Sequence, residues 1–186
     1  MMRRAVIYLL ISSLLCSCVA AVVAGAVGVI VYDRRSLTTI ETDARIFHLI
    51  HKAIVDDRRF QNSHIEVISF NQIVLLVGQT PHASLRIAVE KIAQTTPLVR
   101  RVYNELTISQ PLPVKQKTKD ALITGKVRSY MLGRKGLESG SIRIVTENSI
   151  VYLMGIVTYE QAELAVDVAR HVEGVRKVVK VFRYIT

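Results

Sequence analysis

The chain has 186 residues, of which 50% are hydrophobic and 22% charged, and its formal net charge at pH 7 is +10. Both of its cysteines lie among the first 18 residues, which excludes a disulfide framework or a cysteine-rich metal site for the rest of the chain. The stability of that remainder must come from packing, and about 150 residues suit one ordinary domain or two small ones.

Residues 1–17 have the composition of a bacterial export signal. Arg3 and Arg4 precede an apolar run that ends at Leu15. A short basic segment followed by about 7–15 apolar residues and then a small residue is typical of a signal peptide, which is removed on export. We therefore expect residues 1–17 to be a lipoprotein signal peptide and residues 18–40 to tether the exported chain.

The residue expected to receive the lipid is Cys18. A signal peptidase holds the residue before the cut in a small pocket, which Ser17 fits and Leu15 does not. The sequence here resembles the bacterial lipobox, and this resemblance implies a diacylglycerol on the sulfur and an acyl chain such as palmitate on the new amino group. It also implies sorting to the periplasmic face of the outer membrane, because Val19 rather than an aspartate follows the cysteine.

A plain transmembrane anchor over residues 5–32 is the alternative. This apolar run is long enough for the roughly 20 residues that a bilayer requires. Its second half consists mostly of Ala, Val and Gly, which are weakly hydrophobic or poor helix formers, and this composition favours the lipoprotein. Either alternative places the remaining residues outside the cytoplasm.

The rest of the sequence contains one unit twice. Residues 71–78 match residues 148–155, and an apolar-periodic helix follows each of these segments. Further along, residues 99–102 match residues 175–178. The chain is therefore predicted to hold two similar domains rather than one.

The boundary between the two units is expected at a proline-containing segment. Pro111 and Pro113 lack backbone N–H donors and resist regular structure. We therefore expect a first domain over residues 41–109, a linker over 110–117 and a second domain over 118–186.

Each unit is predicted to fold as helix, strand, strand, helix, strand. In the first unit, Asp43 is a candidate N-cap for the first helix, and Asn71 and Gln72 form a turn before a strand that Gly78 ends. The expected elements are a helix over 44–55, strands over 65–69 and 73–77, a helix over 82–94 and a strand over 99–106.

In the second unit, Ile123, Val127, Tyr130 and Met131 are spaced to face a sheet from one side of the first helix. Two amphipathic helices on one face of a three-stranded sheet would bury the apolar residues of each unit. The expected fold class is therefore α+β, with two tandem α-β-β-α-β domains. The remaining expected elements are strands over 142–146 and 150–156, a helix over 159–171 and a strand over 175–184.

These residues resemble the BON domain family. The resemblance rests on a buried strand with a glycine at its end, Gly78 or Gly155, and on Gly174 and Val175 before a final strand that includes Val178. The chain as a whole is similar to outer-membrane lipoproteins that contain two BON domains. This resemblance implies a role in envelope integrity, contact of the BON domains with phospholipid, and no catalytic activity.

One feature of the family is missing from the first unit. Leu98 stands there at the position that Gly174 occupies in the second unit. The two loops are therefore not expected to be equivalent.

Positive charge is concentrated in the second unit. Residues 33–108 carry ten Lys and Arg against eight Asp and Glu, whereas residues 109–186 carry thirteen against seven. Between Lys115 and Lys135, seven cationic residues are opposed only by Asp120. Because each basic residue near an anionic leaflet contributes about 1 kcal/mol, this segment indicates an anionic phospholipid membrane as the partner.

The first helix of the second unit is the predicted lipid contact. On a helical wheel, Leu122 and Leu132 fall outside the core-facing side and among cations. The alternative is a solvated basic face, in which the linker covers Leu122 and Leu132 closes the end of the helix. The expected phospholipid-binding residues are Leu122, Lys126, Arg128, Ser129, Leu132, Arg134 and Lys135.

The distribution of charge is also compatible with two further classes of binding protein. A protein-binding adaptor would use the nearly neutral first domain to bind an outer-membrane assembly partner. Nucleic-acid binding is suggested by the basic balance, but the chain has no tryptophan and no aromatic residue among the lysines of residues 115–119. We therefore expect no nucleic-acid partner.

Catalytic and metal signatures are weak. His48 and His51 lie one helical turn apart, with Asp56, Asp57 and His64 not far beyond, but the neighbours of His48 belong to the expected core. We interpret these histidines as surface residues and expect no metal site. No compact Ser-His-Asp signature, phosphate loop or cysteine cluster occurs, so we expect neither an enzyme nor a cofactor.

Overall fold

The computed structural model describes residues 33–186, and residues 34–186 form one compact body. The expected signal peptide, the alternative anchor over 5–32 and Cys18 lie outside the described residues. From residue 33 onward, no helix has both the length and the hydropathy needed to cross a bilayer.

The first α/β unit, repeat 1, contains a sheet of three main strands and one short strand. Strands β1 and β2 form an antiparallel hairpin, and β3 and β4 each pair with β2 in parallel. Its elements are α2 (Leu37–Asp56), the 3₁₀ helix η1 (Arg58–Phe60), β1 (His64–Phe70), β2 (Ile73–Thr80), α3 (Ala83–Thr95), β3 (Arg101–Asn104) and β4 (Thr107–Ile108).

The second unit, repeat 2, has the same order, but its last strand is uninterrupted. Strands β5 and β6 are antiparallel, and β7 is parallel to β6. Its elements are α4 (Val114–Gly133), η2 (Ser139–Ser141), β5 (Ile142–Glu147), β6 (Ile150–Val157), α5 (Tyr159–Arg170) and β7 (Lys177–Tyr184). The expected α+β class and the two α-β-β-α-β units are confirmed, and β3 and β4 of repeat 1 correspond to the two ends of the strand that is continuous as β7 in repeat 2.

Both first helices begin earlier than the sequence predicted. Helix α2 begins at Leu37, because the Ser36 side chain accepts a hydrogen bond from the Thr39 amide and caps the helix there. Helix α4 begins at Val114, directly after Pro113, whose fixed φ is compatible with a helix start. Residues 37–40, assigned to the tether, and residues 114–117, assigned to the linker, are therefore helical.

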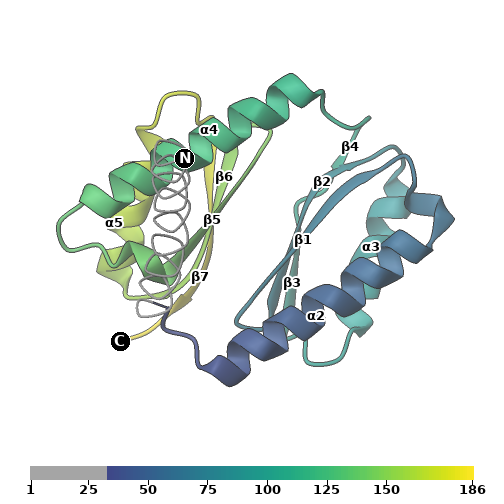
Figure 1. Cartoon of the computed structure of the whole chain (residues 1–186), viewed down its shortest axis with the longest axis horizontal. Coiled ribbons are helices and arrows are strands. Elements are labelled where there is room, and N and C mark those ends of the chain that lie inside the picture. The colour runs from purple at the N-terminus through teal and green to yellow at the C-terminus, as the bar shows by residue number, and fades with distance from the viewer. Residues whose placement is uncertain (1–32) are drawn as a thin grey trace, which may run out of the picture. The chain divides into compact units, whose positions relative to one another are not determined.

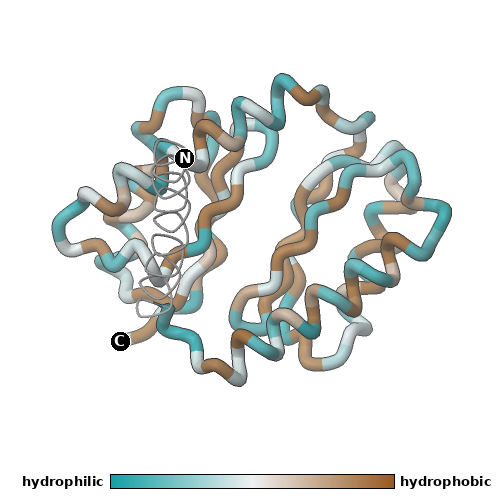
Figure 2. The backbone as a smooth tube through the Cα atoms, in the orientation of Figure 1, coloured by the Kyte–Doolittle hydropathy of each residue, from teal (hydrophilic) through white to brown (hydrophobic). Residues whose placement is uncertain are grey.

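Three apolar clusters divide the body into four layers, with helices outside and two sheets inside (Figure 1). One cluster lies between α2, α3 and the first sheet, and another between α4, α5 and the second sheet. The third joins the two sheets face to face and includes Ile68 and Leu75 from repeat 1 and Tyr152 and Met154 from repeat 2. Hydrophobic residues accordingly run along the strands of both sheets (Figure 2).

The central strands β2 and β6 are buried along most of their length, since each has helices on one side and the other sheet on the opposite side. Gly78 lies inside β2 and does not end it, so that prediction is wrong. With φ of 122°, Gly78 adopts a conformation that side chains rarely tolerate, and a Cβ there would lie 2.0 Å from the backbone oxygen of His64.

The loop that lacks the family glycine keeps the backbone conformation. Leu98 has φ of 71°, and Gly174 in the corresponding loop has φ of 93°. A leucine in the left-handed region costs about 1–2 kcal/mol. The substitution therefore strains repeat 1 without changing the course of its backbone.

Candidate functional site

Helix α4 has an apolar inner side and a mixed outer side. Ile123, Val127 and Met131 are buried against the second sheet, as predicted. Leu122 is 63% exposed and Leu132 is 71% exposed, so neither the linker nor the end of the helix covers them. The two leucines are thus available to a partner.

Tyr130 was predicted to face the sheet, and this is wrong. Its side chain is 59% exposed. Tyr130 directly precedes buried Met131, and a helix turns by about 100° per residue, so the two side chains point in clearly different directions. The exposed surface of α4 therefore includes an aromatic residue in addition to its two leucines.

Some of the predicted cations of α4 are held by acidic residues of repeat 2. Lys126 Nζ lies 3.3 Å from Glu173 Oε2, and the guanidinium of Arg134 lies 3.6 Å from Asp167 Oδ2. These pairs are largely exposed to solvent and therefore weak. They reduce the positive charge on one flank of the helix.

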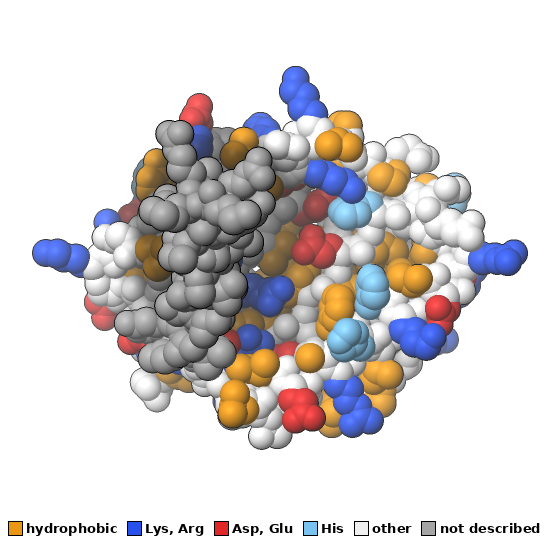
Figure 3. All heavy atoms as spheres, in the orientation of Figure 1, with side chains coloured by type: hydrophobic (Ala, Val, Ile, Leu, Met, Phe, Trp, Pro, Cys, Tyr) orange, Lys and Arg blue, Asp and Glu red, His pale blue; other side chains and the backbone are white. Residues whose placement is uncertain are grey.

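The other predicted residues lie on the exposed surface. Ser129 and Arg128 are on α4, and Lys135 follows its C-cap residue, Arg134. Over residues 33–186, no ion pair forms at Arg128 or Lys135. Cationic and hydrophobic side chains also lie side by side at the top of Figure 3, where Figure 1 places the start of α4. The predicted residues are thus all exposed, and they extend along α4 from Leu122 to the residues just after its end.

A buried carboxylate that the sequence analysis did not identify fixes α4 to its sheet. The Asn148 amide donates to Asp120 Oδ2 and the Ser149 amide to Asp120 Oδ1, each at 2.8 Å. Asn148 and Ser149 both have positive φ and form the turn between β5 and β6. Asp120 therefore ties the helix to this hairpin turn.

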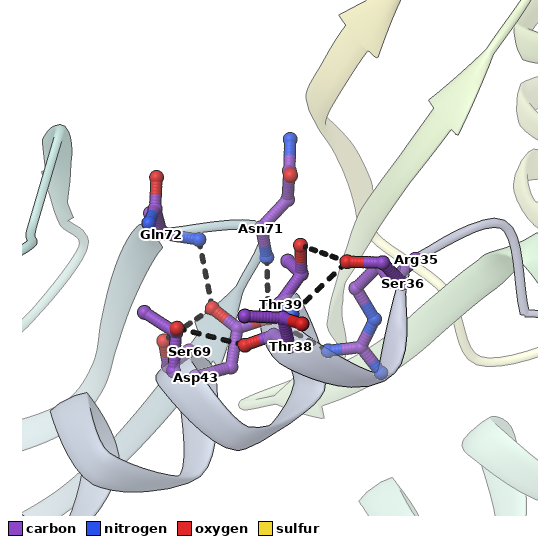
Figure 4. Close-up of polar contacts among 9 residues, drawn as sticks. Arg35, Ser36, Thr38, Thr39, Asp43, Ser69, Asn71 and Gln72 are labelled. Atoms are coloured by element: carbon purple, nitrogen blue, oxygen red, sulfur yellow. Dashed lines mark hydrogen bonds and ion pairs between the residues drawn. The ribbon is translucent and has the colours of Figure 1, made fainter.

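Asp43 does the same in repeat 1, so it is not the predicted N-cap. It lies inside α2 and accepts hydrogen bonds from the amides of Asn71 and Gln72, each at 2.7 Å (Figure 4). Ser69 and Arg35 donate to the same carboxylate. In both repeats the aspartate precedes the turn asparagine by 28 positions in the sequence. This shared spacing is the sequence signal from which Asp43 and Asp120 could have been identified as equivalent residues.

The candidate metal ligands do not converge. The ring of His51 stacks on Phe47 at 5.2 Å, and the ring of His48 meets the same phenylalanine edge-on at 5.3 Å. In the described part of the chain, no group of three His, Cys, Asp or Glu side chains is arranged to hold a metal ion. These histidines instead border an aromatic side chain on α2.

Both repeats match a known protein family, and the whole chain has similar relatives. The family model of the BON domain matches residues 42–110 and 119–186. The chain is 33% identical over 171 residues to "Outer membrane lipoprotein DolP" of Haemophilus influenzae, which covers 90% of this chain and 89% of that protein.

Two other relatives match shorter segments. The chain is 34% identical over 125 residues to the "21 kDa hemolysin" of Actinobacillus pleuropneumoniae, covering 67% of this chain and 64% of that one. It is 28% identical over 144 residues to an uncharacterized protein of Anaplasma centrale, covering 76% and 93%. All three matches are compatible with a chain built from the same repeated unit.

Proposed function

The chain belongs to the BON domain family and has two BON domains, and from this premise we propose that it is an outer-membrane lipoprotein whose helix α4 binds anionic phospholipid. In this proposal a lipid on Cys18 anchors the chain to the periplasmic face of the outer membrane. The docked helix then supports the integrity of the envelope. The 33% identical relative, whose name describes an outer-membrane lipoprotein, supports the location.

The observation that carries the lipid contact is the outer side of α4. Leu122 and Leu132 are mostly exposed, and Arg128 and Lys135 lie nearby without an acidic partner among residues 33–186. Full burial of a leucine in an apolar environment contributes about 1.5–3 kcal/mol. Each cation near an anionic leaflet contributes about 1 kcal/mol. The two contributions together favour a surface that inserts shallowly between headgroups.

The expected affinity of this surface for a membrane is modest, but the lipid anchor makes it sufficient to keep α4 bound. A tethered domain meets the membrane at a high effective concentration, so a weak contact is occupied most of the time. The pairs Lys126–Glu173 and Arg134–Asp167 stay on the flank of the helix. We therefore assign the main electrostatic contribution to Arg128, Lys135 and the lysines at the start of α4.

Vesicle binding by residues 34–186 tests this proposal, because that fragment is one compact body and contains all three apolar clusters. We expect cosedimentation with phosphatidylglycerol vesicles and much weaker cosedimentation with phosphatidylcholine vesicles. The substitution Leu122→Glu should reduce the affinity at least about tenfold, because it removes an apolar contact and adds a repelled charge.

The matched control is Ile87→Glu on α3, where the side chain is 66% exposed but outside the proposed surface. This variant should bind anionic vesicles as the parent does. Arg128→Glu should weaken binding, and about 0.5 M salt should weaken it further by screening. Equal binding to both kinds of vesicle, or equal loss in Leu122→Glu and Ile87→Glu, would contradict the assignment to α4.

A further inference from the structure

A groove lies where repeat 1 meets the edge strand of repeat 2. Its volume is about 290 Å³, and its lining comes from α2, from β1, from the segment before α2 and from β5. Ile40, Ala44 and Phe47 supply apolar contacts, while Arg35 and Arg143 supply positive charge. Sites for small molecules are typically about 300–1,000 Å³, so this groove suits a headgroup-sized ligand rather than a whole lipid.

Arg143 is the central residue of this groove. It alternates along β5 with Ile142 and Ile144, which pack under the helices, so it lies on the side that faces the other sheet. Within residues 33–186, no hydrogen bond or ion pair engages its guanidinium. Arg143 is exposed on β5, so a ligand can reach its guanidinium. Partial desolvation, and next the proximity of Arg35, lower the pKa of Arg143 below its ordinary value. A guanidinium that has no acceptor within residues 33–186 can donate to one from outside the protein.

Arg35 is held in place beside it. Its Nη1 donates to Asp43 Oδ2 at 2.9 Å, and its guanidinium carbon lies 4.2 Å from the centre of the Phe70 ring. The side chain of Arg35 is only 12% exposed. Because these contacts hold the guanidinium before any ligand arrives, little conformational entropy is lost on binding.

Asp43 lines the groove and forms an ion pair with Arg35, so it offsets the charge of that arginine, whereas Arg143 has no such partner within residues 33–186. Asp43 already accepts hydrogen bonds from Ser69, Asn71 and Gln72 in addition to Arg35. Partial desolvation, and next the repulsion of Glu147, raise the pKa of Glu66, while Arg143 acts in the opposite direction. On the cationic side, Arg128 of α4 is close enough to act on Arg143. The groove therefore continues the positive surface of α4 towards the junction of the two sheets.

We propose that this groove binds one phosphate group, with Arg143 and Arg35 as its two arginine ligands. Arginine presents several N–H donors in a planar fork that matches phosphate oxygens. The phosphate can belong to an anionic lipid headgroup or to a soluble phosphate ester, since the chemistry of recognition is the same. The lipid source rests on the proposed docking of α4, whereas the soluble source does not.

The test uses residues 34–186 and two phosphate probes. Titration with glycerol phosphate is followed by NMR of the arginine Nε–Hε signals, and titration with phosphatidylglycerol vesicles by cosedimentation. We expect saturable shifts of Arg143 and Arg35 and an affinity for glycerol phosphate that falls about tenfold or more in Arg143→Gln. Arg58→Gln is the control, because Arg58 belongs to η1 and does not line the groove.

Each outcome separates the sources. If Arg143→Gln weakens both glycerol phosphate and vesicle binding, the groove takes a lipid headgroup, and if it weakens only the soluble probe, the groove takes a free phosphate ester. If glycerol phosphate produces no saturable shift and Arg143→Gln binds vesicles like the parent, the groove proposal is overturned. Loss of vesicle binding in Leu122→Glu would still support the docking of α4 in that case. Acetate that shifts Arg143 with the same affinity as glycerol phosphate would overturn the assignment to phosphate.

Discussion

Two buried aspartates hold equivalent positions in the two repeats and organise each hairpin turn. Asp43 and Asp120 are each less than 5% exposed, and each accepts hydrogen bonds from two consecutive backbone amides. Hydrogen bonds to a charged group contribute about 1.5–3 kcal/mol. A helix, a turn and a sheet are therefore joined in each repeat through one side chain.

We expect Asp120→Asn to destabilise the protein by about 3 kcal/mol, because an amide has a single acceptor oxygen and its NH₂ group would oppose one of the two backbone amides. The free energy of unfolding, measured by urea denaturation, checks this value. Asp56→Asn is the control, since Asp56 is exposed and, among the residues from 33 onward, pairs only with Lys52 one turn away on α2. A loss as small in Asp120→Asn as in Asp56→Asn would show that the clamp, meaning the hydrogen bonds from Asn148 and Ser149 to Asp120, contributes little to the stability.

At the scale of the elements, the hairpins β1–β2 and β5–β6 differ in how closely their strands approach. Gly78 pairs with Ile65, and Gly155 occupies the matching position opposite Ile142. A Cβ at Gly78 would lie 2.0 Å from the His64 oxygen, whereas one at Gly155 would lie 2.9 Å from the Ser141 oxygen. Only Gly78 also has a positive φ. Repeat 1 thus depends on its glycine more strongly.

Gly78→Ala should cost at least about 3 kcal/mol of stability, from backbone strain and forced separation of β1 from β2. Gly155→Ala should cost less, about 1–2 kcal/mol, because its φ is ordinary. Gly125→Ala serves as the control on α4, where nothing lies within 4 Å of the added methyl, and should stabilise by about 0.5–1 kcal/mol. Thermal unfolding of the three variants measures this order, and equal losses in Gly78→Ala and Gly155→Ala would contradict it.

Sequence patterns predicted the existence of the helices and strands better than they predicted the ends of these elements or the side-chain contacts between them. The helices and strands follow from periodicity, but the Ser36 cap and the helix start after Pro113 shifted two boundaries. Leu122 and Leu132 were correctly placed on the outer side of α4, while Tyr130 was not. The Asp120 clamp joins residues 28 positions apart, a distance over which helical or strand periodicity carries no information.

For the whole molecule, the main feature is the contact between the two sheets. The sequence analysis did not establish this arrangement, although the nearly continuous apolar runs of β2 and β6 are typical of strands buried on both faces. Polar residues occur within the contact. Gln79 is 1% exposed, donates to Glu147 of repeat 2 and accepts from the amide of Leu112 in the connecting segment. This one side chain thus joins both repeats and the segment between them.

The carboxyl group of Glu66, on the strand β1 at this contact, is expected to make the stability of the protein dependent on pH. Burial, followed by repulsion from Glu147, raises the pKa of Glu66 above its ordinary value of 4.5, while His64 and Arg143 act in the opposite direction. A raised folded-state pKa means that the contribution of Glu66 to stability is complete below about pH 4.5 and is lost as the pH rises through the folded-state value.

Glu66→Gln, which imitates the protonated form, should therefore raise the stability at pH 7 and give no comparable gain near pH 4. Urea denaturation at both pH values provides the measurement, with Glu41→Gln on the exposed side of α2 as the control. A stabilisation that is the same at both pH values would mean that Glu66 is not the titrating group.

Because each sheet uses its neighbour as a cover, neither repeat is a self-sufficient module. A gene truncated at the connecting prolines would encode a protein with a bare apolar face that carries Ile68, Phe70 and Leu75. An exposed apolar face of this kind tends to associate with another apolar surface. In the intact chain, that surface is the sheet of the other repeat. Duplication therefore does more than double a binding surface, because it provides each copy with the second sheet that covers its apolar face.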